Sequence, residues 1–452
     1  MGRLFGTDGV RGVANKELTA SLAFDIGRAA AFVLGKGTGR PLFVVGRDTR
    51  VSGDMLENAL TAGILSVGGN VMKLGVIPTP AVAYLVRHYD ADAGVVISAS
   101  HNSFEYNGIK LFNGDGFKLD DSIEEEIEDI ILAREFVHPE FVGDKLGKCV
   151  EAEEDALSIY TKFLLSTIDI SLDGVKVVID TANGASYKTA RMVYEALGAE
   201  VHTIANDPDG ININDNCGST HPENLLKEVV KQGADIGMAY DGDADRLVIA
   251  DEKGRLLDGD RVMCICGKML KDEGTLNGDL VTATVMSNIG FHRYLEDNGM
   301  KAEVTKVGDR YVLESMLKTG SVLGGEQSGH MIFLNYTTTG DGVLSSLQFV
   351  KAWKASGKKV SELRDGVTIY PQALVNARVT PAGKASALKD QEVQNKIAEV
   401  EEKLGDTGRV LIRPSGTEPL MRVMIEGEDE AEIASFANEI AQLILSKYGD
   451  DK

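Results

Sequence analysis

Three aspartates alternate with small residues in the segment Asp241-Gly242-Asp243-Ala244-Asp245-Arg246. Carboxylates this close repel one another strongly unless a cation neutralises them. Hard oxygen ligands favour Mg²⁺ over zinc. Asp241, Asp243 and Asp245 are therefore candidate ligands of a magnesium ion.

Two alternatives to a magnesium site remain open for this segment. It could be a solvated acidic turn. It could also be a calcium loop of the EF-hand type, because Glu252 stands at the twelfth position. That loop needs glycine at the sixth position, where this chain has Arg246, and residues 247–250 have the pattern of a strand.

A serine and a histidine are adjacent in Ser98-Ala99-Ser100-His101-Asn102-Ser103. A serine hydroxyl needs a base or a metal ion to become a good nucleophile. The Gly-x-Ser-x-Gly elbow of hydrolases is not present here. The local sequence leaves open whether Ser100 is a nucleophile or part of a structural turn.

Two further segments could bind an anion. Arg413-Pro414-Ser415-Gly416-Thr417-Glu418-Pro419 offers a guanidinium, two hydroxyls and backbone amides, which suit a phosphate, with Arg422 nearby; an ordinary Pro/Gly turn is the alternative. Arg11 stands among glycines in residues 5–12. The Gly-rich fingerprints of P-loop NTPases and dinucleotide enzymes are absent from the sequence. Taken together, a metal triad, a serine and a phosphate cradle indicate phosphoryl transfer through a phosphorylated serine.

A strand–helix–strand unit that recurs three times must position these loops. The first strands are expected at 42–46, 175–180 and 280–284, and the helices at about 53–67, 185–197 and 289–298. After each unit, a further strand (95–97, 236–240, 322–323) runs into a polar loop. Ligands bind beyond the carboxyl ends of strands in such sheets, so three similar domains would each bring one loop to a shared cleft. General α/β patterning is the competing explanation.

The last part of the chain has a different pattern. Strands are expected at 374–379, 409–412 and 420–425, followed by an amphipathic helix with apolar residues from Ile433 to Ile444. The fold class is therefore α/β: three similar α/β domains with mixed sheets covered by helices, plus a C-terminal α+β domain, around a central cleft. The expected domains are 1–150 with the serine loop, 151–253 with the metal loop, 254–367 with the third polar loop and 368–452 with the phosphate-binding loop.

Composition narrows the function classes. The net charge of −22 disfavours nucleic acid and anionic membrane as partners. The four cysteines suggest no disulfide framework, and Cys264 and Cys266 are expected to be buried apolar residues. The N-terminus lacks the apolar core of a signal peptide, and no uncharged apolar run reaches about 18 residues. We expect a cytoplasmic protein.

Four loops in this order (98–102, 241–246, 325–330 and 413–417) resemble those of the α-D-phosphohexomutase superfamily over the whole chain. Residues 1–12 and Gly325-Glu326-Gln327-Ser328-Gly329-His330 resemble the branch that acts on glucosamine phosphates; the branch acting on mannose and glucose phosphates more often has Met in place of Gln327. One departure is Ser103, where the superfamily usually has proline. Its loss removes no catalytic group.

The resemblance implies interconversion of glucosamine 6-phosphate and glucosamine 1-phosphate through a bisphosphorylated sugar, in the amino sugar metabolism that supplies UDP-N-acetylglucosamine. It implies that Ser100 is a phosphoserine that shares Mg²⁺ with the three aspartates, and that a sugar 1,6-bisphosphate is the activator. The residues it places at the reaction centre are Arg11, His101, Lys110, Arg246 and His330. Those it assigns to the sugar and its other phosphate are Arg310, Glu326, Ser328, Arg413, Ser415, Gly416, Thr417 and Arg422. Relatives of this kind also suggest a homodimer.

Three rivals stay open at this level. A mutase of mannose or glucose phosphates is the nearest. A metal-dependent phosphatase would pass the phosphoryl group to water, and a sugar-phosphate sensor would use the same scaffold without catalysis. A sensor has no need of Ser100 or of the aspartate triad.

Overall fold

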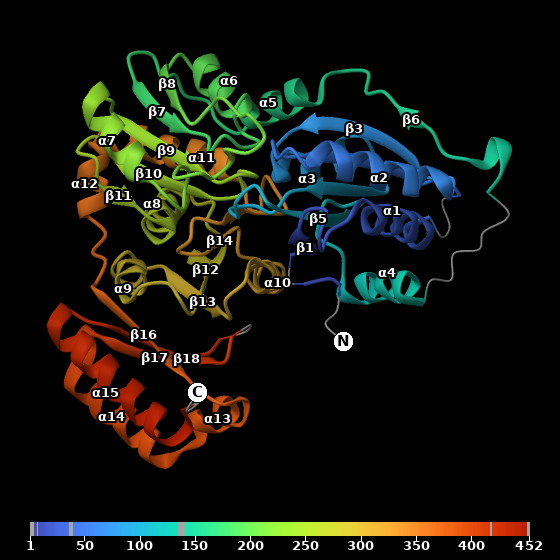
Figure 1. Cartoon of the computed structure of the whole chain (residues 1–452). Helices are drawn as coiled ribbons and strands as arrows, with labels where there is room; N and C mark the ends of the chain where they lie inside the picture. The colour runs from blue at the N-terminus through green and yellow to red at the C-terminus, as the bar shows by residue number, and fades with distance from the viewer. Residues whose placement is uncertain (1–3, 7, 36–38, 134–140, 416–417, 450–452) are drawn as a thin grey trace. The chain divides into compact units, whose positions relative to one another are not determined.

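A computed structural model describes residues 4–6, 8–35, 39–133, 141–415 and 418–449 (Figure 1). The described residues form two compact units, one of residues 1–286 with 299–366 and the other of residues 287–298 with 367–452. The first unit contains three sheets and the second contains one. No helix in the described part of the chain is long and apolar enough to cross a membrane.

The three sheets of the first unit share one topology. Their common orders are β3-β2-β4-β5, β8-β7-β9-β10 and β13-β12-β14-β15. In each, three parallel strands are followed by one antiparallel strand. The expected repeat and the mixed sheets are thus confirmed, and each polar loop connects the third parallel strand to its antiparallel neighbour.

The first sheet has six strands, because β1 and β6 extend it at its edges. Its third parallel strand, β4, is buried along its whole length, as expected of a strand covered by helices on both faces. Its strands are β1 (Val10–Val13), β2 (Leu42–Arg47), β3 (Asn70–Val76), β4 (Ala93–Ile97), β5 (Tyr106–Asn113) and β6 (Cys149–Val150). Its helices are α1 (Ala20–Leu34), α2 (Gly53–Ser66), α3 (Thr79–His88) and α4 (Asp121–Ala133).

The second and third sheets are smaller but follow the same plan. The second has β7 (Lys176–Asp180), β8 (Glu200–Ile204), β9 (Ile236–Tyr240), β10 (Leu247–Asp251) and β11 (Leu256–Leu257), with α5 (Ala156–Ser166), α6 (Thr189–Ala196) and α7 (Glu223–Gln232). The third has β12 (Leu280–Thr284), β13 (Lys301–Thr305), β14 (Leu323–Gly325) and β15 (Met331–Phe333), with α8 (Gly259–Asp272), α10 (Asp309–Thr319), α11 (Gly342–Ser356) and α12 (Val360–Asp365). Helix α6 begins later than the expected residue 185, because the preceding segment forms turns and the amide of Ala185 donates to the carbonyl of Gly242 at 2.8 Å.

The second unit is the expected α+β domain together with one helix from earlier in the chain. Its antiparallel sheet, β16-β18-β17, carries α14 (Gln391–Leu404) and α15 (Glu430–Tyr448). The strands are β16 (Gln372–Arg378), β17 (Arg409–Pro414) and β18 (Leu420–Glu426), and α13 is Pro381–Ser386.

Helix α9 (Ile289–Asp297) belongs to this second unit, although the sequence places it between β12 and β13. The buried carboxylate of Glu426 accepts hydrogen bonds from the amide of Ile289 at 2.9 Å and from Nε of Arg409 at 2.7 Å. A carboxylate at a helix N-terminus satisfies free amides and interacts favourably with the helix dipole. These contacts connect α9 firmly to the C-terminal sheet.

All four cysteines are free thiols; Cys264 and Cys266 are buried, as expected, and Cys149 is exposed.

Candidate active site

Ser100 lies directly against the aspartate triad. Its Oγ donates a hydrogen bond to Oδ2 of Asp241 at 2.6 Å, and Ser100 is 2% exposed. The serine loop follows β4 and the triad follows β9, so both stand at carboxyl ends of parallel strands. Gly242 allows this approach, because a Cβ there would lie 2.6 Å from the carbonyl oxygen of Ser100.

The triad has the chemistry of a site for a hard divalent cation. Ligand atoms of Asp241, Asp243 and Asp245 all lie within 4.8 Å of one another, and all three residues are buried. Among the described residues, Oδ1 of Asp243 and Oδ1 of Asp245 are buried without a hydrogen-bond partner. Burial and the two neighbouring carboxylates raise the pKa of Asp241 well above its usual range. A bound cation would remove this repulsion and supply the missing partner.

Lys110 is the buried cation of this cluster. Its Nζ lies 2.9 Å from Oδ2 of Asp243, 3.0 Å from Oδ2 of Asp8 and 3.9 Å from Oδ2 of Asp245. Burial works against the charged amine, but these carboxylates outweigh it and raise the pKa of Lys110. Lys110 is therefore a buried positive charge among the carboxylates of this cluster.

Backbone hydrogen bonds tie the metal loop to both neighbouring domains. The amide of Thr79, at the start of α3, donates to the carbonyl of Asp243 at 3.0 Å, and its Oγ1 donates to Oδ2 of Asp243 at 2.7 Å. Arg246 forms a β-bridge with His330 of the third domain. Together with the hydrogen bond from Ser100 to Asp241, these contacts hold the polar loops of the three domains together, as the repeat predicted.

The ring of His101 is the neutral basic group next to Ser100. Its Nδ1 lies 3.4 Å from Oγ of Ser100. Burial, helped by Arg246 and Arg11, lowers the pKa of His101 to about 4. Arg11 pairs with Asp8, which also contacts Lys110.

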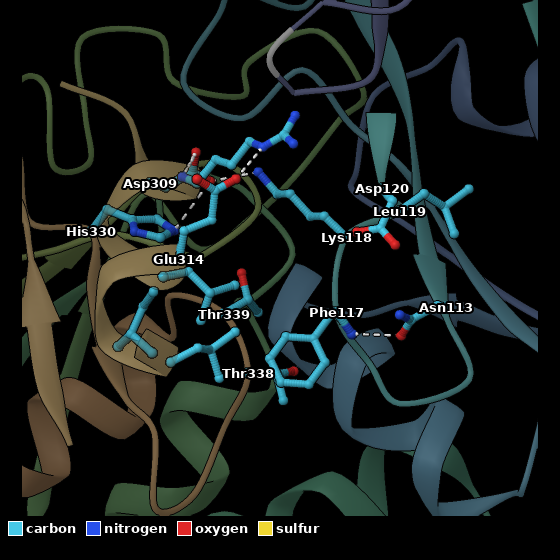
Figure 2. Close-up of a pocket in the computed structure, with 14 residues that line it drawn as sticks. Asn113, Phe117, Lys118, Leu119, Asp120, Asp309, Glu314, His330, Thr338 and Thr339 are labelled. Atoms are coloured by element: carbon cyan, nitrogen blue, oxygen red, sulfur yellow. Dashed lines mark hydrogen bonds and ion pairs between the residues drawn. The ribbon is translucent and has the colours of Figure 1, made fainter. Parts of the chain in front are cut away.

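A cavity of about 270 Å³ lies beside this cluster (Figure 2). Figure 2 shows His330, Asp309 and Lys118 at one end of it and Phe117 at the other, and Ile332 also lines it. Lys118 pairs with Asp309, and Nε2 of His330 lies 3.9 Å from Oδ2 of Asp309. Both ring nitrogens of His330 are buried without a hydrogen-bond partner in the described part of the chain. They are thus available to a ligand.

The other residues expected to bind the sugar are Glu326, Ser328 and Arg310. Oε1 of Glu326 accepts a hydrogen bond from the amide of Gly308 at 3.0 Å. Ser328 is exposed in the same loop as Glu326. Arg310 lines the cavity, but its guanidinium pairs with Asp121 and Glu314.

The expected phosphate-binding residues lie in the second unit. Arg413 of β17 and Arg422 of β18 are directly opposite each other in the sheet. Burial and the neighbouring Arg422 lower the pKa of Arg413. Ser415 is buried and its Oγ accepts from the amide of Glu418 at 3.2 Å. Gly416 and Thr417 lie outside the described residues.

Sequence reasoning missed several residues that contact the predicted ones. Asp8 could have been suspected, because it stands three residues before Arg11 in the same Gly-rich turn. Thr79 and Lys118 carried no signal in the sequence. Asp309 stands in Gly308-Asp309-Arg310, which resembles a superfamily loop near the sugar, although only Arg310 was named as a site residue. Their contacts all come from elements far apart in the sequence.

A serine hydroxyl on a buried acidic triad, at the strand ends of three repeated α/β domains, defines an enzyme of phosphoryl transfer. Models of the phosphoglucomutase/phosphomannomutase family match the chain in four consecutive pieces. The α/β/α domains I, II and III match residues 2–138, 158–254 and 258–370, and the C-terminal domain matches residues 374–443.

Curated relatives match over the whole length. A phosphoglucosamine mutase of Clostridium novyi is 57% identical over 447 residues, covering 99% of both chains. One of Clostridium acetobutylicum is 56% identical over 447 residues, covering 99% of this chain and 100% of the relative. This chain therefore belongs to the phosphoglucomutase/phosphomannomutase family, within the α-D-phosphohexomutase superfamily, and is an intramolecular phosphotransferase.

Solved structures show the same fold at lower identity. A phosphoglucomutase/phosphomannomutase family protein of Burkholderia thailandensis superposes with a TM-score of 0.82 at 24% identity, covering 98% of this chain and 97% of that one. An N-acetylphosphoglucosamine mutase of Aspergillus fumigatus, solved with GlcNAc-6P and magnesium, superposes with a TM-score of 0.70 at 17% identity, covering 99% and 96%.

Proposed function

We propose that this protein interconverts glucosamine 6-phosphate and glucosamine 1-phosphate, with Ser100 carrying the transferred phosphoryl group. The observation that carries the proposal is the 2.6 Å hydrogen bond from Oγ of Ser100 to Asp241, within a buried triad that has unsatisfied carboxylate oxygens. Identity above 50% to phosphoglucosamine mutases over nearly the full chain supports the choice of sugar.

The reaction begins with phosphorylated Ser100. Its phosphoryl group passes to the 1-hydroxyl oxygen of the 6-phosphate, and the hydroxyl proton goes to a base. This yields a sugar 1,6-bisphosphate and free Ser100. The intermediate turns over, its 6-phosphoryl group returns to Ser100, and the 1-phosphate is released. The same bisphosphate, supplied from outside, would act as activator by phosphorylating Ser100.

His101 is one candidate to accept and return the proton. It is next to Oγ of Ser100, and its lowered pKa keeps it neutral at physiological pH. Lys110 would stabilise negative charge, together with Arg11 and Arg246. His330, whose ring nitrogens are unsatisfied, is the second candidate for a proton carrier.

Asp241, Asp243, Asp245 and an oxygen on Ser100 would hold Mg²⁺, whose positive charge would stabilise the transferring phosphoryl group. Glu326 and Ser328 would contact sugar hydroxyls, with Arg310 close by. Arg413, Ser415 and Arg422, with Gly416 and Thr417, would bind the phosphate that is not being transferred. Each of these assignments rests on the superfamily resemblance and on the residue chemistry.

The product would feed the synthesis of UDP-N-acetylglucosamine. Such a pathway fits a cytoplasmic enzyme, and we propose that location together with a homodimeric state.

The test is isomerisation of glucosamine 6-phosphate by the purified protein with Mg²⁺ and a trace of hexose 1,6-bisphosphate. We expect conversion that is lost on chelation with EDTA and lost in Ser100→Ala. Full activity of Ser100→Ala would disprove the phosphoserine mechanism.

Parallel reactions separate the rivals. Glucose and mannose phosphates are tested beside glucosamine phosphate, and faster turnover of either one would move the assignment to that sugar. Release of free phosphate without isomer formation would indicate a phosphatase.

A further inference from the structure

The backbone of Ser100 adopts a conformation that its residue type does not favour. Its φ is +51°, in the left-handed region. A serine keeps such a conformation only where the surrounding structure holds it. The loop must therefore be held by groups outside it.

The side chain of Arg50 is one such group. It is fully buried, and its Nη2 donates to the carbonyl oxygens of Ser100 at 2.9 Å and of Asn102 at 2.8 Å. Its Nη1 donates to the carbonyl of Tyr106 at 3.1 Å and to that of Ser103. One planar guanidinium thus donates to four carbonyls, three in the serine loop and one at the first residue of β5.

The remaining donor of Arg50, its Nε, is linked to the amide of Ser100 through two other side chains. Its Nε donates to Oδ2 of Asp48 at 2.8 Å, and the same oxygen accepts from Oγ of Ser98 at 2.6 Å. Oγ of Ser98 in turn accepts from the amide of Ser100 at 3.0 Å. All five N–H donors of the guanidinium are therefore used. The amide and the carbonyl of Ser100 both belong to one buried network.

Asn214 of the second domain also donates to the carbonyls of Ser100 and Asn102. Its Nδ2 lies 2.9 Å from the carbonyl oxygen of Ser100 and 2.9 Å from that of Asn102. The domain that supplies the metal loop thus also holds the serine loop. Asn214 is itself in the left-handed region, with a φ of +59°.

We infer that Arg50 and Asn214 are positioning residues that aim Oγ of Ser100 at the metal triad and at the incoming sugar hydroxyl; this inference rests on the proposed function. Neither side chain touches the reacting atoms. They hold the strained backbone conformation of Ser100, and this conformation aligns the phosphoryl donor with its acceptor.

The test compares Arg50→Lys with Arg47→Lys. Lysine keeps the charge but has three donors and no planar fork, so it cannot make these contacts together. Arg47 is the matched control, because it stands three residues away and its described partners are Asp54 and Glu57. We expect Arg50→Lys to lower kcat about 10- to 100-fold per folded molecule with KM within about twofold. Arg47→Lys should keep both constants.

A second readout does not depend on the reaction. Hydrogen exchange of the amides in residues 98–106, followed by mass spectrometry, should be at least about tenfold faster in Arg50→Lys than in Arg47→Lys, with other regions unchanged. If Arg50→Lys has faster exchange but an unchanged kcat, Arg50 is only structural and the inference is wrong. If the wild-type protein isomerises no sugar phosphate, the proposed function fails, and the exchange measurement alone decides whether Arg50 holds the loop.

If Arg50→Lys does not fold, Asn214→Gly tests the same inference. Glycine accepts the left-handed backbone of this position while the amide group is lost. We expect kcat about fivefold lower with KM retained. A kcat equal to wild type would overturn the inference.

Discussion

Replacing Lys110 by Met tests whether one buried ammonium stabilises the acidic cluster. Lys110 is 2% exposed and has three carboxylate neighbours, two of them within 3.0 Å of Nζ. Methionine has a similar length and removes the charge. The carboxylates of Asp243 and Asp8 would then remain partly or fully buried without their cation.

The magnitude follows from these distances. At an effective dielectric constant of about 20, each of the two close pairs is worth about 5 kcal/mol of Coulomb energy, most of which offsets the desolvation of the charges. Removing one partner of a buried ion pair costs about 3–5 kcal/mol. For a compact unit of about 350 residues, with an unfolding entropy of about 2.1 cal/mol/K per residue, this corresponds to a Tm lower by roughly 4–7 °C.

Calorimetry of the apo-protein in EDTA measures this effect. Lys73→Met is the control, because Lys73 is about one-third exposed and its pair with Glu57 is 3.4 Å long. Glu57 is buried but keeps Nε of Arg47 at 3.9 Å, so the loss of the partly exposed Lys73 should cost less than the loss of Lys110. Added Mg²⁺ should restore more of the Tm of Lys110→Met than it adds to the control, since the cation replaces the missing positive charge.

The reasoning would be refuted by a Lys110→Met protein whose Tm in EDTA equals that of Lys73→Met. Such a result would mean that Lys110 does not neutralise the cluster. A lower Tm that Mg²⁺ does not selectively restore would contradict the placement of a cation site at the triad.

Three further predictions concern the metal, the pH and the phosphate. Asp245→Asn should weaken Mg²⁺ binding at least about tenfold by titration calorimetry, since it removes one of three buried carboxylates; an unchanged Kd would contradict this. Burial raises the pKa of Asp341 to about 6, above about 3.9 in the unfolded chain, so its contribution to stability is full below pH 4 and is lost as the pH rises through 6. Asp341→Asn should remove that slope, at most about 1.4 kcal/mol per pH unit, from urea unfolding curves measured between pH 4 and 6, and an unaltered slope would count against it. Inorganic phosphate should raise the Tm of the C-terminal unit, because it binds the facing pair Arg413 and Arg422. Arg413→Ala should abolish this rise in Tm, and the exposed control Arg378→Ala should keep it. A rise that survives in Arg413→Ala would exclude this site.

Local sequence patterns predicted much of the fold. The third copy of the repeat was predicted with its strand at 280–284, where β12 lies, and the metal loop was predicted after residues 236–240, where β9 lies. These succeeded because apolar runs and the polar loops that end them are set by neighbours in the sequence. The start of α6 was wrong, since its first residues serve contacts with the metal loop rather than helix formation.

The chemical content of the site was also readable in part. The spacing of Asp241, Asp243 and Asp245 made them candidate ligands of a cation, because like charges so close repel, although a solvated acidic turn remained an alternative. The role of Ser100 stayed ambiguous in the local sequence. It was the tertiary structure that placed its Oγ against Asp241, 141 residues away.

The sequence by itself determined which chemical groups this protein has, the repeated strand–loop units that present them, and the order of those units. The tertiary structure alone decided which charges meet: Lys110 with Asp243, Arg50 with the carbonyls of the serine loop, and Glu426 with the first turn of α9. It also decided the left-handed backbone of Ser100. The physical reason is range. Strand and loop patterns arise from interactions between near neighbours in the sequence. The ion pairs, the sheet against which a helix packs and the strained backbone depend on packing among segments more than 40 residues apart.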